Sequence, residues 1–307
     1  MQSQEVQMLE RMWFPVARVE DVGPDRPFGA EILGRRVVVF RDSATVAAAA
    51  DRCPHRGGRL SDGRMVEGAL QCPYHGWRWA LDGRCVLVPS QPGAHPNVRL
   101  QSVSSRERFG LVWTTLGDPL LEPPEIAEMQ DPDGGWEVAC GQWFDVRCGL
   151  RSITENFRDS SHFAFVHRDT FGDVNPEISA YTVDRRSGGL SWSISLTFGP
   201  RWATDTVARE RASKYRFGET DGTPSEEERL DLHYRFAVPS FAYVFTEHAE
   251  GGRRLVCQAA TPTDTTGQRC RVFWFVAANE AFRRRFGDLK TQLTIEAKVF
   301  SEDVRIV

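Results

Sequence analysis

The sequence lacks a long hydrophobic run. Nowhere among its 307 residues do about eighteen apolar residues follow one another, the length that a membrane-spanning helix needs. The first residues, MQSQEVQMLERMWFP, have no apolar segment of the kind found in secretory signal peptides, so we expect a cytoplasmic protein without a membrane partner. Basic residues are not in excess either, because the formal net charge at pH 7 is −4. This charge argues against a nucleic-acid or membrane-surface partner.

A disulfide framework is also missing. The seven cysteines are an odd number, and five of them show no regular spacing: Cys85, Cys140, Cys148, Cys257 and Cys270. We interpret these five as reduced thiols in a cytosolic protein. The hydrophobic fraction of 41% is sufficient for a packed core, and the length allows one large domain or two ordinary ones.

The two other cysteines each precede a histidine in a loop rich in glycine and proline. The motifs are CPHRG at 53–57 and CPYHGW at 72–77. The four candidate ligands are Cys53, His55, Cys72 and His75. Structural zinc sites usually combine C-x2-4-C with H-x3-5-H spacing, whereas each half here pairs one Cys with one His. This alternation is typical of a [2Fe–2S] cluster with two Cys on one iron and two His on the other. A zinc site and four unrelated polar residues are the alternatives.

A second group of candidate ligands lies about ninety residues later in the chain, at Asp159, His162 and His167. Two His and one carboxylate with open positions form the facial triad of non-haem Fe(II) oxygenases. On an ideal helix the two His would diverge by about 140°. The helix must therefore loosen through a π-type turn, or end between them. The alternative is an ordinary helix whose histidines are satisfied in the core.

The pattern predicts an α+β protein with two domains. Residues 1–118 are typical of a small all-β domain, and a proline-rich stretch at 117–135 has the composition of a linker. Residues 119–307 predict an antiparallel sheet with long helices, and 201–228 predict a long loop, either a lid or a surface insertion. Strands are expected at 36–40, 65–66, 77–81, 85–88, 111–114, 136–146, 190–196, 230–238, 255–260 and 271–277, and helices near 5–12, 150–166 and 279–307.

The motifs together resemble a known family. The opening WFPVA at 13–17, the two Cys/His loops, GLVW at 110–113 and the segment 155–167 are similar to the catalytic (alpha) subunit of Rieske non-haem iron oxygenases. The smaller homomeric members, of the vanillate O-demethylase type, are the closest likeness. The resemblance implies an N-terminal all-β Rieske [2Fe–2S] domain, followed by a helix-grip (START-like) catalytic domain with an antiparallel sheet and a long C-terminal helix.

The resemblance also implies roles for individual residues. Cys53, His55, Cys72 and His75 would hold the cluster, and His162 and His167 the mononuclear iron. Asp159 matches an acid that links an iron-ligand His to the cluster of a neighbouring subunit, and Asn156 matches a residue near the iron. The third iron ligand matches Asp303 in the phrase FSEDV at 300–304. Helical periodicity alone would allow either Asp303 or Glu302 to face inward, and the resemblance favours Asp303 over Glu302 or Asp288.

The implied function is that of a terminal oxygenase. It would use O2, with electrons relayed from the Rieske cluster to Fe(II), to hydroxylate or demethylate a small aromatic or cyclic substrate. A monooxygenase or demethylase is expected rather than a cis-dihydroxylating dioxygenase. The expected partners are a ferredoxin or flavin reductase, fed indirectly by NAD(P)H, and further copies of the chain in a head-to-tail trimer. The alternative is a Rieske electron-transfer protein with a non-catalytic ligand-binding domain.

Substrate-binding residues are not identified by the sequence. Arg78, Arg235 and His233 would suit a substrate carboxylate, although a solvated strand face is the simpler interpretation. Aromatic residues on alternating strands would suit a pocket but are also typical of ordinary core: Phe198, Trp202, Phe236, Phe241, Tyr243, Phe245, Phe273 and Trp274.

Overall fold

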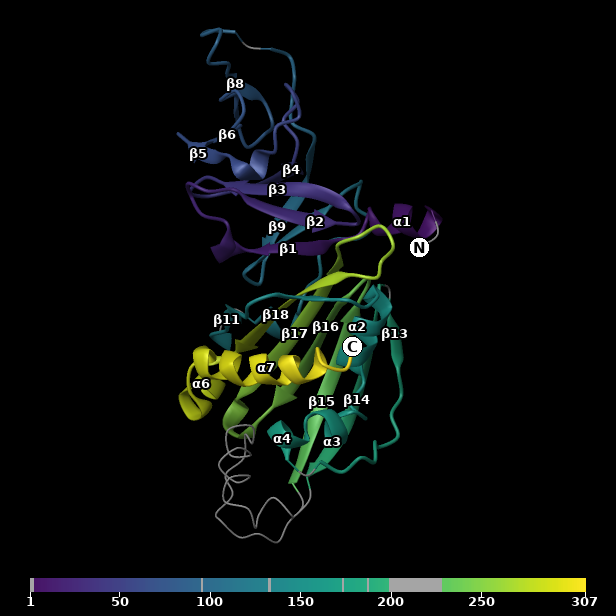
Figure 1. Ribbon diagram of the computed structural model, residues 1–307. Coiled ribbons are helices and arrows are strands. Elements are labelled where there is room, and N and C mark those ends of the chain that lie inside the picture. Colours follow the sequence, from purple (N-terminus) through teal and green to yellow (C-terminus); the bar gives the residue numbers. More distant parts are fainter. Residues whose placement is uncertain (1–2, 95, 132–133, 173, 187, 199–227) are drawn as a thin grey trace. The chain divides into compact units, whose positions relative to one another are not determined.

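The computed structural model describes residues 3–94, 96–131, 134–172, 174–186, 188–198 and 228–307 (Figure 1). The loop predicted at 201–228 lies outside these residues except for its last position. The chain folds into two compact units. The first unit is Met1–Pro124 together with Ala260–Arg271, and the second is Glu125–Ala259 together with Val272–Val307.

The first unit is built on two antiparallel sheets. One has the order β1-β10-β9-β4-β3-β2, with the strands Phe14–Arg18, Leu111–Thr115, Ser102–Arg108, Val46–Ala50, Arg35–Arg41 and Phe28–Ile32. The other has the order β5-β6-β7-β8, with the strands Arg64–Val66, Ala69–Gln71, Arg78–Trp79 and Cys85–Leu87. The short helices are α1 (Ser3–Leu9), η1 (Val19–Asp21) and η2 (Leu60–Asp62). The prediction of an all-β N-terminal region is confirmed.

Hairpins hold the second Cys/His loop in place. Strand β6 ends directly before Cys72 and β7 begins directly after Trp77, so the CPYHGW motif is the tip of the β6–β7 hairpin. The adjoining β5–β6 hairpin turns at Glu67 and Gly68, which both have positive φ (52° and 75°), as a type I′ turn requires.

The first Cys/His loop is pinned by a buried carboxylate. Asp51 accepts hydrogen bonds from the backbone N and the Oγ of Ser61, both at 2.7 Å. Its side chain is almost fully buried and also contacts Arg59. The residues before and after the CPHRG motif are therefore joined by these hydrogen bonds, which restrain the loop between them.

The second unit contains an eight-stranded antiparallel sheet in the order β11-β18-β17-β16-β15-β14-β13, with β12 also paired to β18. In chain order the strands β11 to β18 are Glu137–Cys140, Phe144–Val146, Asp184–Arg186, Gly189–Phe198, Glu228–Ala237, Phe241–Glu247, Arg253–Pro262 and Cys270–Ala278. The helices are η3 (Ala127–Met129), α2 (Leu150–Arg158), α3 (Phe163–Val166), α4 (Arg168–Phe171), η6 (Ala249–Gly251), α6 (Glu280–Phe286) and α7 (Leu289–Asp303). The predicted α+β layout with an antiparallel sheet and C-terminal helices is confirmed.

Three predicted elements are interrupted. The single strand expected at 136–146 is two short strands, and the helix expected at 279–307 breaks at Gly287, whose φ of +89° favours glycine. The helix expected at 150–166 ends at Arg158, and only its last residues are helical again, as α3. Asp159 leaves the helical region (φ −93°, ψ 118°), and its Oδ1 accepts hydrogen bonds from the N and Oγ of Ser161. Such local bonds compete with the helix and end it.

Helix α7 lies across the sheet (Figure 1). Its buried positions recur every three to four residues from Leu289 to Asp303, as expected for one helix face on a sheet. Phe300 packs against Trp274 of β18 with ring centroids 4.9 Å apart, and against Phe157 of α2 at 6.3 Å. Burying a side chain of this size is worth about 1.5–3 kcal/mol, so this packing fixes the rotation of α7. No helix in the described part of the chain has both the length and the apolar character to cross a membrane.

Candidate functional site

Three predicted ligand residues of the second unit converge on one point. The Nε2 atoms of His162 and His167 are 3.2 Å apart. Asp303 Oδ1 lies 3.4 Å from His162 Nε2 and 3.2 Å from His167 Nε2. One ion at about 2.0–2.2 Å from each atom, the usual range for metal–nitrogen and metal–carboxylate bonds, fits between donors this close. These three side chains can therefore hold a metal ion.

The break between two short helices brings the histidines together. His162 directly precedes α3, and His167 lies between α3 and α4 with φ −101° and ψ 19°. Of the two expected arrangements, a π-type turn or a helix end between the histidines, the structure has the helix end, because α3 ends at Val166. Asp303 is the last residue of α7 and reaches the same point from a segment far along the chain.

A buried tyrosine anchors the loop that carries His162. Tyr234 of β15 has no exposed surface, and its hydroxyl lies 2.6 Å from Ser160 Oγ. Burial raises the pKa of Tyr234 far above its ordinary value, so the phenol stays protonated. Its ring stacks on Trp192 of β14 at 5.1 Å. No sequence pattern indicates this pair, because Ser160 and Tyr234 are 74 residues apart.

The charges of the site suit a cation. Burial alone would raise the pKa of Asp303, but hydrogen bonds from His162 and His167 lower it to about 2, so the carboxylate is ionised at neutral pH. Burial would lower the pKa of His167, but Asp303 and Glu302 outweigh it and raise that pKa. Asn156 Nδ2 lies 3.3 Å from Asp303 Oδ1 and donates to it, which restrains the carboxylate from α2.

The two acids at the end of α7 have different positions. Asp303 faces the Nε2 atoms, whereas Glu302 Oε2 lies 2.9 Å from Nδ1 of His167, on the other side of the ring. Thr170 Oγ1 donates to Glu302 Oε1 at 2.5 Å, which holds the carboxylate in place. A carboxylate bonded to the far nitrogen of a ligand histidine orients the ring and raises its basicity as a ligand. The sequence indicated Glu302 only as an alternative ligand, and no local pattern predicts its place behind His167.

Replacing Glu302 by glutamine tests its role. We expect the affinity for ferrous iron to fall by about tenfold to a hundredfold, as for other residues behind metal ligands, because the charge behind His167 is lost while the side-chain shape is kept. A chelator titration measures the change. The matched control is Glu280→Gln on α6, where the acid is exposed and pairs with Arg284. Equal chelator midpoints for Glu302→Gln and the unaltered protein would contradict this role.

Asp159 lies on the outer side of His162. Its Oδ2 is 3.9 Å from His162 Nδ1, and its side chain is 52% exposed. A hollow of about 450 Å³ opens beside it, also lined by Arg158, Ser161, Tyr181 and Trp192. The acid is thus close to one iron-ligand candidate and accessible from outside the chain.

The two Cys/His loops of the first unit repeat the same turn. The carbonyl of Cys53 accepts a hydrogen bond from the N of Gly57, and that of Cys72 accepts one from the N of Gly76. Both glycines are in the left-handed region, with φ of +71° and +70°. A side chain at either position would be strained there, which explains why each motif places a glycine four residues after its cysteine.

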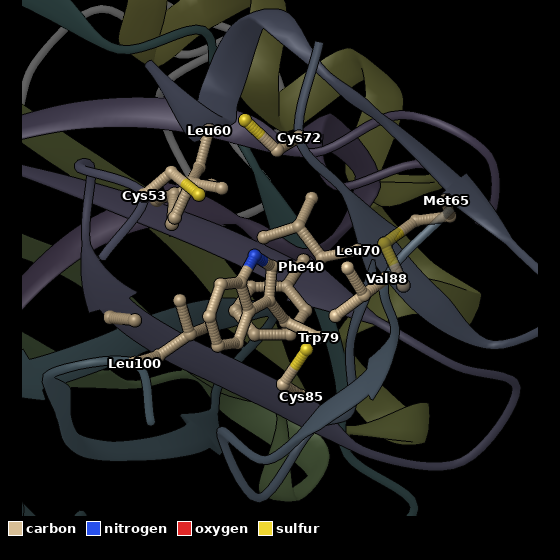
Figure 2. Close-up of a cluster of buried hydrophobic side chains, with 12 residues drawn as sticks. Phe40, Cys53, Leu60, Met65, Leu70, Cys72, Trp79, Cys85, Val88 and Leu100 are labelled. Carbon is tan, nitrogen blue, oxygen red and sulfur yellow. The ribbon is translucent and has the colours of Figure 1, made fainter. Parts of the chain in front are cut away.

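The donors of these loops form a sulfur pair and an imidazole pair. Cys53 and Cys72 are buried, and Figure 2 shows their side chains at one edge of a hydrophobic cluster. The rings of His55 and His75 are 4.7 Å apart, and His55 also stacks on Trp77 at 4.4 Å. Burial raises the pKa of Cys53 to about 11, so a metal must displace the thiol proton. Burial, His75 and Arg56 lower the pKa of His55, which keeps that ring neutral as a ligand.

This arrangement fits a cluster of two irons better than one zinc ion. A tetrahedral site would bring four donors within one coordination sphere. In the described part of the chain, no three of the Cys53, His55, Cys72 and His75 donors lie within 4.8 Å of one another, whereas those of the His162 site do. Two pairs on neighbouring irons match the Rieske ligand pattern.

Several of the aromatic residues considered for a substrate pocket are part of the hydrophobic core instead. Phe241, Phe273 and Trp274 are almost fully buried in the core. Trp202 and the side chain of Phe198 lie outside the described residues.

The polar candidates have partners of their own. Arg78 pairs with Glu67 at 2.7 Å and Arg235 with Glu128 at 3.6 Å. His233 Nδ1 lies 2.8 Å from the Oγ of Ser193, on an exposed strand face. The simpler interpretation of these three residues, as part of a solvated surface, agrees with these contacts.

Comparison with known proteins gives two domain matches. Residues 12–103 match the Rieske [2Fe-2S] domain, and residues 146–307 match the vanillate O-demethylase oxygenase C-terminal domain. The vanillate O-demethylase oxygenase subunit of Pseudomonas sp. (strain HR199 / DSM 7063) is 28% identical in an alignment of 310 positions that covers 95% of this chain and 83% of that protein. Methylxanthine N3-demethylase NdmB of Pseudomonas putida is 29% identical in an alignment of 285 positions that covers 87% of this chain and 73% of that protein.

A solved structure has the same fold. NdmA of Pseudomonas putida CBB5, as the QL mutant with theobromine, superimposes with a TM-score of 0.77 at 23% identity and covers 99% of this chain and 83% of that chain. In sequence, NdmA is 34% identical in an alignment of 194 positions that covers 60% of this chain and 55% of that protein. With both domain matches on one polypeptide, the chain belongs to the vanillate O-demethylase family of Rieske oxygenase catalytic subunits.

Proposed function

We propose that this chain is the terminal oxygenase of a demethylase or monooxygenase acting on a small aromatic or cyclic substrate. The observation that carries the proposal is the convergence of His162, His167 and Asp303 in a chain that also has the two Cys/His loops. The relatives named above support demethylation, because they are named for the loss of a methyl group from oxygen or nitrogen. A cis-dihydroxylating reaction has no such support.

The proposed iron sites use nine residues. Cys53, His55, Cys72 and His75 hold the [2Fe–2S] cluster, and His162, His167 and Asp303 hold a mononuclear ferrous ion, with Asn156 and Asp159 beside it. When bound, the cluster supplies single electrons and the ferrous ion supplies a site where dioxygen is activated. Three protein donors are fewer than a ferrous ion can bind, so coordination positions would remain for dioxygen and substrate.

The surrounding side chains keep this geometry. Glu302 fixes the ring of His167, because it bonds the nitrogen that does not face the ion. Asn156 donates to the Asp303 oxygen that faces both histidines, so it limits rotation of that carboxylate. Ser160 and Tyr234 hold the loop on which His162 lies. These contacts prepare the site before metal binds, which limits the reorganisation needed at each turnover.

The chain needs an electron donor. Enzymes of this family receive electrons from a reductase or ferredoxin, and the vanillate relative is named as one subunit of its enzyme. We propose that NAD(P)H supplies the electrons to the reductase and that the protein works in the reducing cytoplasm. All the described cysteines are free thiols, which agrees with such a compartment.

The proposed assembly is a head-to-tail ring of three chains, in which one chain's cluster meets the next chain's iron. A heterologous interface that closes on itself makes such a ring. Half-exposed Asp159 and the exposed ring of Tyr74, next to His75, support it, because each lies beside one of the two metal sites. We also propose that residues 1–118 form the Rieske domain and residues 119–307 the catalytic domain.

Iron content and oxygen uptake test the function. The oxygenase requires about three irons per chain, whereas an electron-transfer protein with a non-catalytic domain requires about two. With a surrogate reductase and NADH, methoxybenzoates, N-methylated heterocycles and alkaloid-like amines are screened for O2 uptake. Demethylation consumes O2, two electrons and two protons and releases formaldehyde and water, so formaldehyde separates it from ring hydroxylation. About two irons and no substrate-dependent uptake would favour the electron-transfer alternative.

A further inference from the structure

Trp79, on strand β7, is fully buried next to the two cluster cysteines. It belongs to the same hydrophobic cluster as Cys53, Cys72 and Phe40 (Figure 2). Its indole N–H is buried, and no atom in the described residues, sulfur included, accepts a full hydrogen bond from it. Buried donors are nearly always paired, because leaving one without an acceptor is costly.

Two other buried tryptophans of the first unit do have oxygen acceptors. Trp13 donates to the carbonyl of Leu121 at 2.8 Å, and Trp113 donates to the carbonyl of Arg108 at 3.2 Å. Both are in the same unit as Trp79. The lack of an oxygen acceptor is therefore a property of the position of Trp79 and is not shared by all tryptophans of this core.

The groups that the indole nitrogen faces are sulfur atoms. Figure 2 shows the indole nitrogen on the ring edge that faces Cys53 and Cys72. The indole interacts with the thiol of Cys53 without forming a full hydrogen bond to it. A thiol is a weak acceptor, and an ionised group accepts a much stronger hydrogen bond. The indole N–H thus gains a full partner when Cys53 is a metal-bound thiolate.

We propose that Trp79 tunes the reduction potential of the cluster by donating its indole N–H to the sulfur of Cys53. The inference rests on the proposed assignment of Cys53, His55, Cys72 and His75 as cluster ligands. One-electron reduction adds negative charge to the cluster. A donor aimed at a ligand sulfur stabilises the reduced form more than the oxidised form, and so raises the potential.

Trp79→Phe removes the donor and keeps an aromatic ring in the core. In the holoprotein we expect the ratio of reduced to oxidised cluster at a fixed potential to fall about tenfold, which is about 59 mV for a one-electron couple. An optical redox titration measures it. The matched control is Trp113→Phe, which loses an N–H that bonds a backbone carbonyl, and its midpoint should not change.

A second measurement is independent of the potential. After exchange into D2O, pulsed EPR of the reduced cluster should detect a deuteron coupled to it that is absent in Trp79→Phe. If Trp79→Phe does not assemble the cluster, 3-benzothienylalanine at position 79 keeps the shape of the indole without the N–H and provides the same comparison.

The possible results separate the two hypotheses. A lower midpoint and a lost deuteron coupling support the role of Trp79. An unchanged midpoint in a fully loaded variant overturns it and leaves the site assignment intact. Wild-type protein that contains no cluster after reconstitution would instead refute the proposed function.

Discussion

Asp303→Asn should lower the turnover rate about a thousandfold and leave the iron–sulfur cluster intact. Asp303 is the only acid among the three converging donors of the described site, and its low pKa keeps it charged at neutral pH. Asparagine has the same shape but no charge, so iron binding weakens sharply. Metal activation is worth several kcal/mol, and a loss of about 4 kcal/mol corresponds to about a 10³-fold lower rate.

Metal analysis and kinetics check this prediction together. Iron should fall from about three to about two per chain, while the visible spectrum of the cluster stays unchanged. The control is Asp288→Asn at the beginning of α7, where the side chain caps the helix by accepting from the N of Thr291. Asparagine is an equally good cap, so this variant should keep its iron and its rate. Full iron content and turnover in Asp303→Asn would refute the assignment of the third ligand.

Asp159→Asn should retain both metal centres and still lose coupled turnover. The acid lies 3.9 Å from Nδ1 of His162, on the side away from the other two donors, and half of its side chain is exposed. In the proposed ring it links His162 to the cluster of the neighbouring chain. Removing the carboxylate should slow the passage of electrons between the centres by about 10²-fold, at the upper end of the effects seen for residues behind metal ligands.

Rapid mixing of the reduced, substrate-bound protein with O2 measures this step. The oxidation of the cluster is followed in the visible spectrum, and it should be slow in Asp159→Asn while the iron content matches that of the unaltered protein. Asp169→Asn removes the same charge from the neighbouring helix α4, where the acid is exposed, and should react at the normal rate. Normal cluster oxidation in Asp159→Asn would show that the carboxylate is not part of the route.

Local sequence patterns predicted the parts of the structure that depend on neighbouring residues. Alternation of apolar and polar residues located β14 and β15, and the tight-turn pair Asp82-Gly83 located the hairpin between β7 and β8. The spacing of His162 and His167 required either a π-type turn or a helix end between them, and the structure has the helix end. The same pattern placed the end of α2 too late, because Asp159 and Ser161 form a side-chain turn that apolar periodicity does not reveal.

Contacts between distant residues could not be predicted in this way. Glu302 and Asp303 are about 100° apart on a helix, so periodicity allowed either one to face the histidines. The choice is made by the packing of Phe300 on Trp274, which sets the rotation of α7. The pair of Thr170 and Glu302 spans 132 residues and leaves no local signal in the sequence.

The end of α7 has an electrostatic consequence for the metal. The aligned peptide dipoles of a helix place about half a negative elementary charge at its C-terminus, and Asp303 is the last residue of this fifteen-residue helix. A bound cation would therefore experience the helix end in addition to two carboxylates. This negative field favours a trivalent over a divalent ion. Iron should therefore be released more readily in the ferrous than in the ferric state. Metal exchange should be fastest under anaerobic reducing conditions.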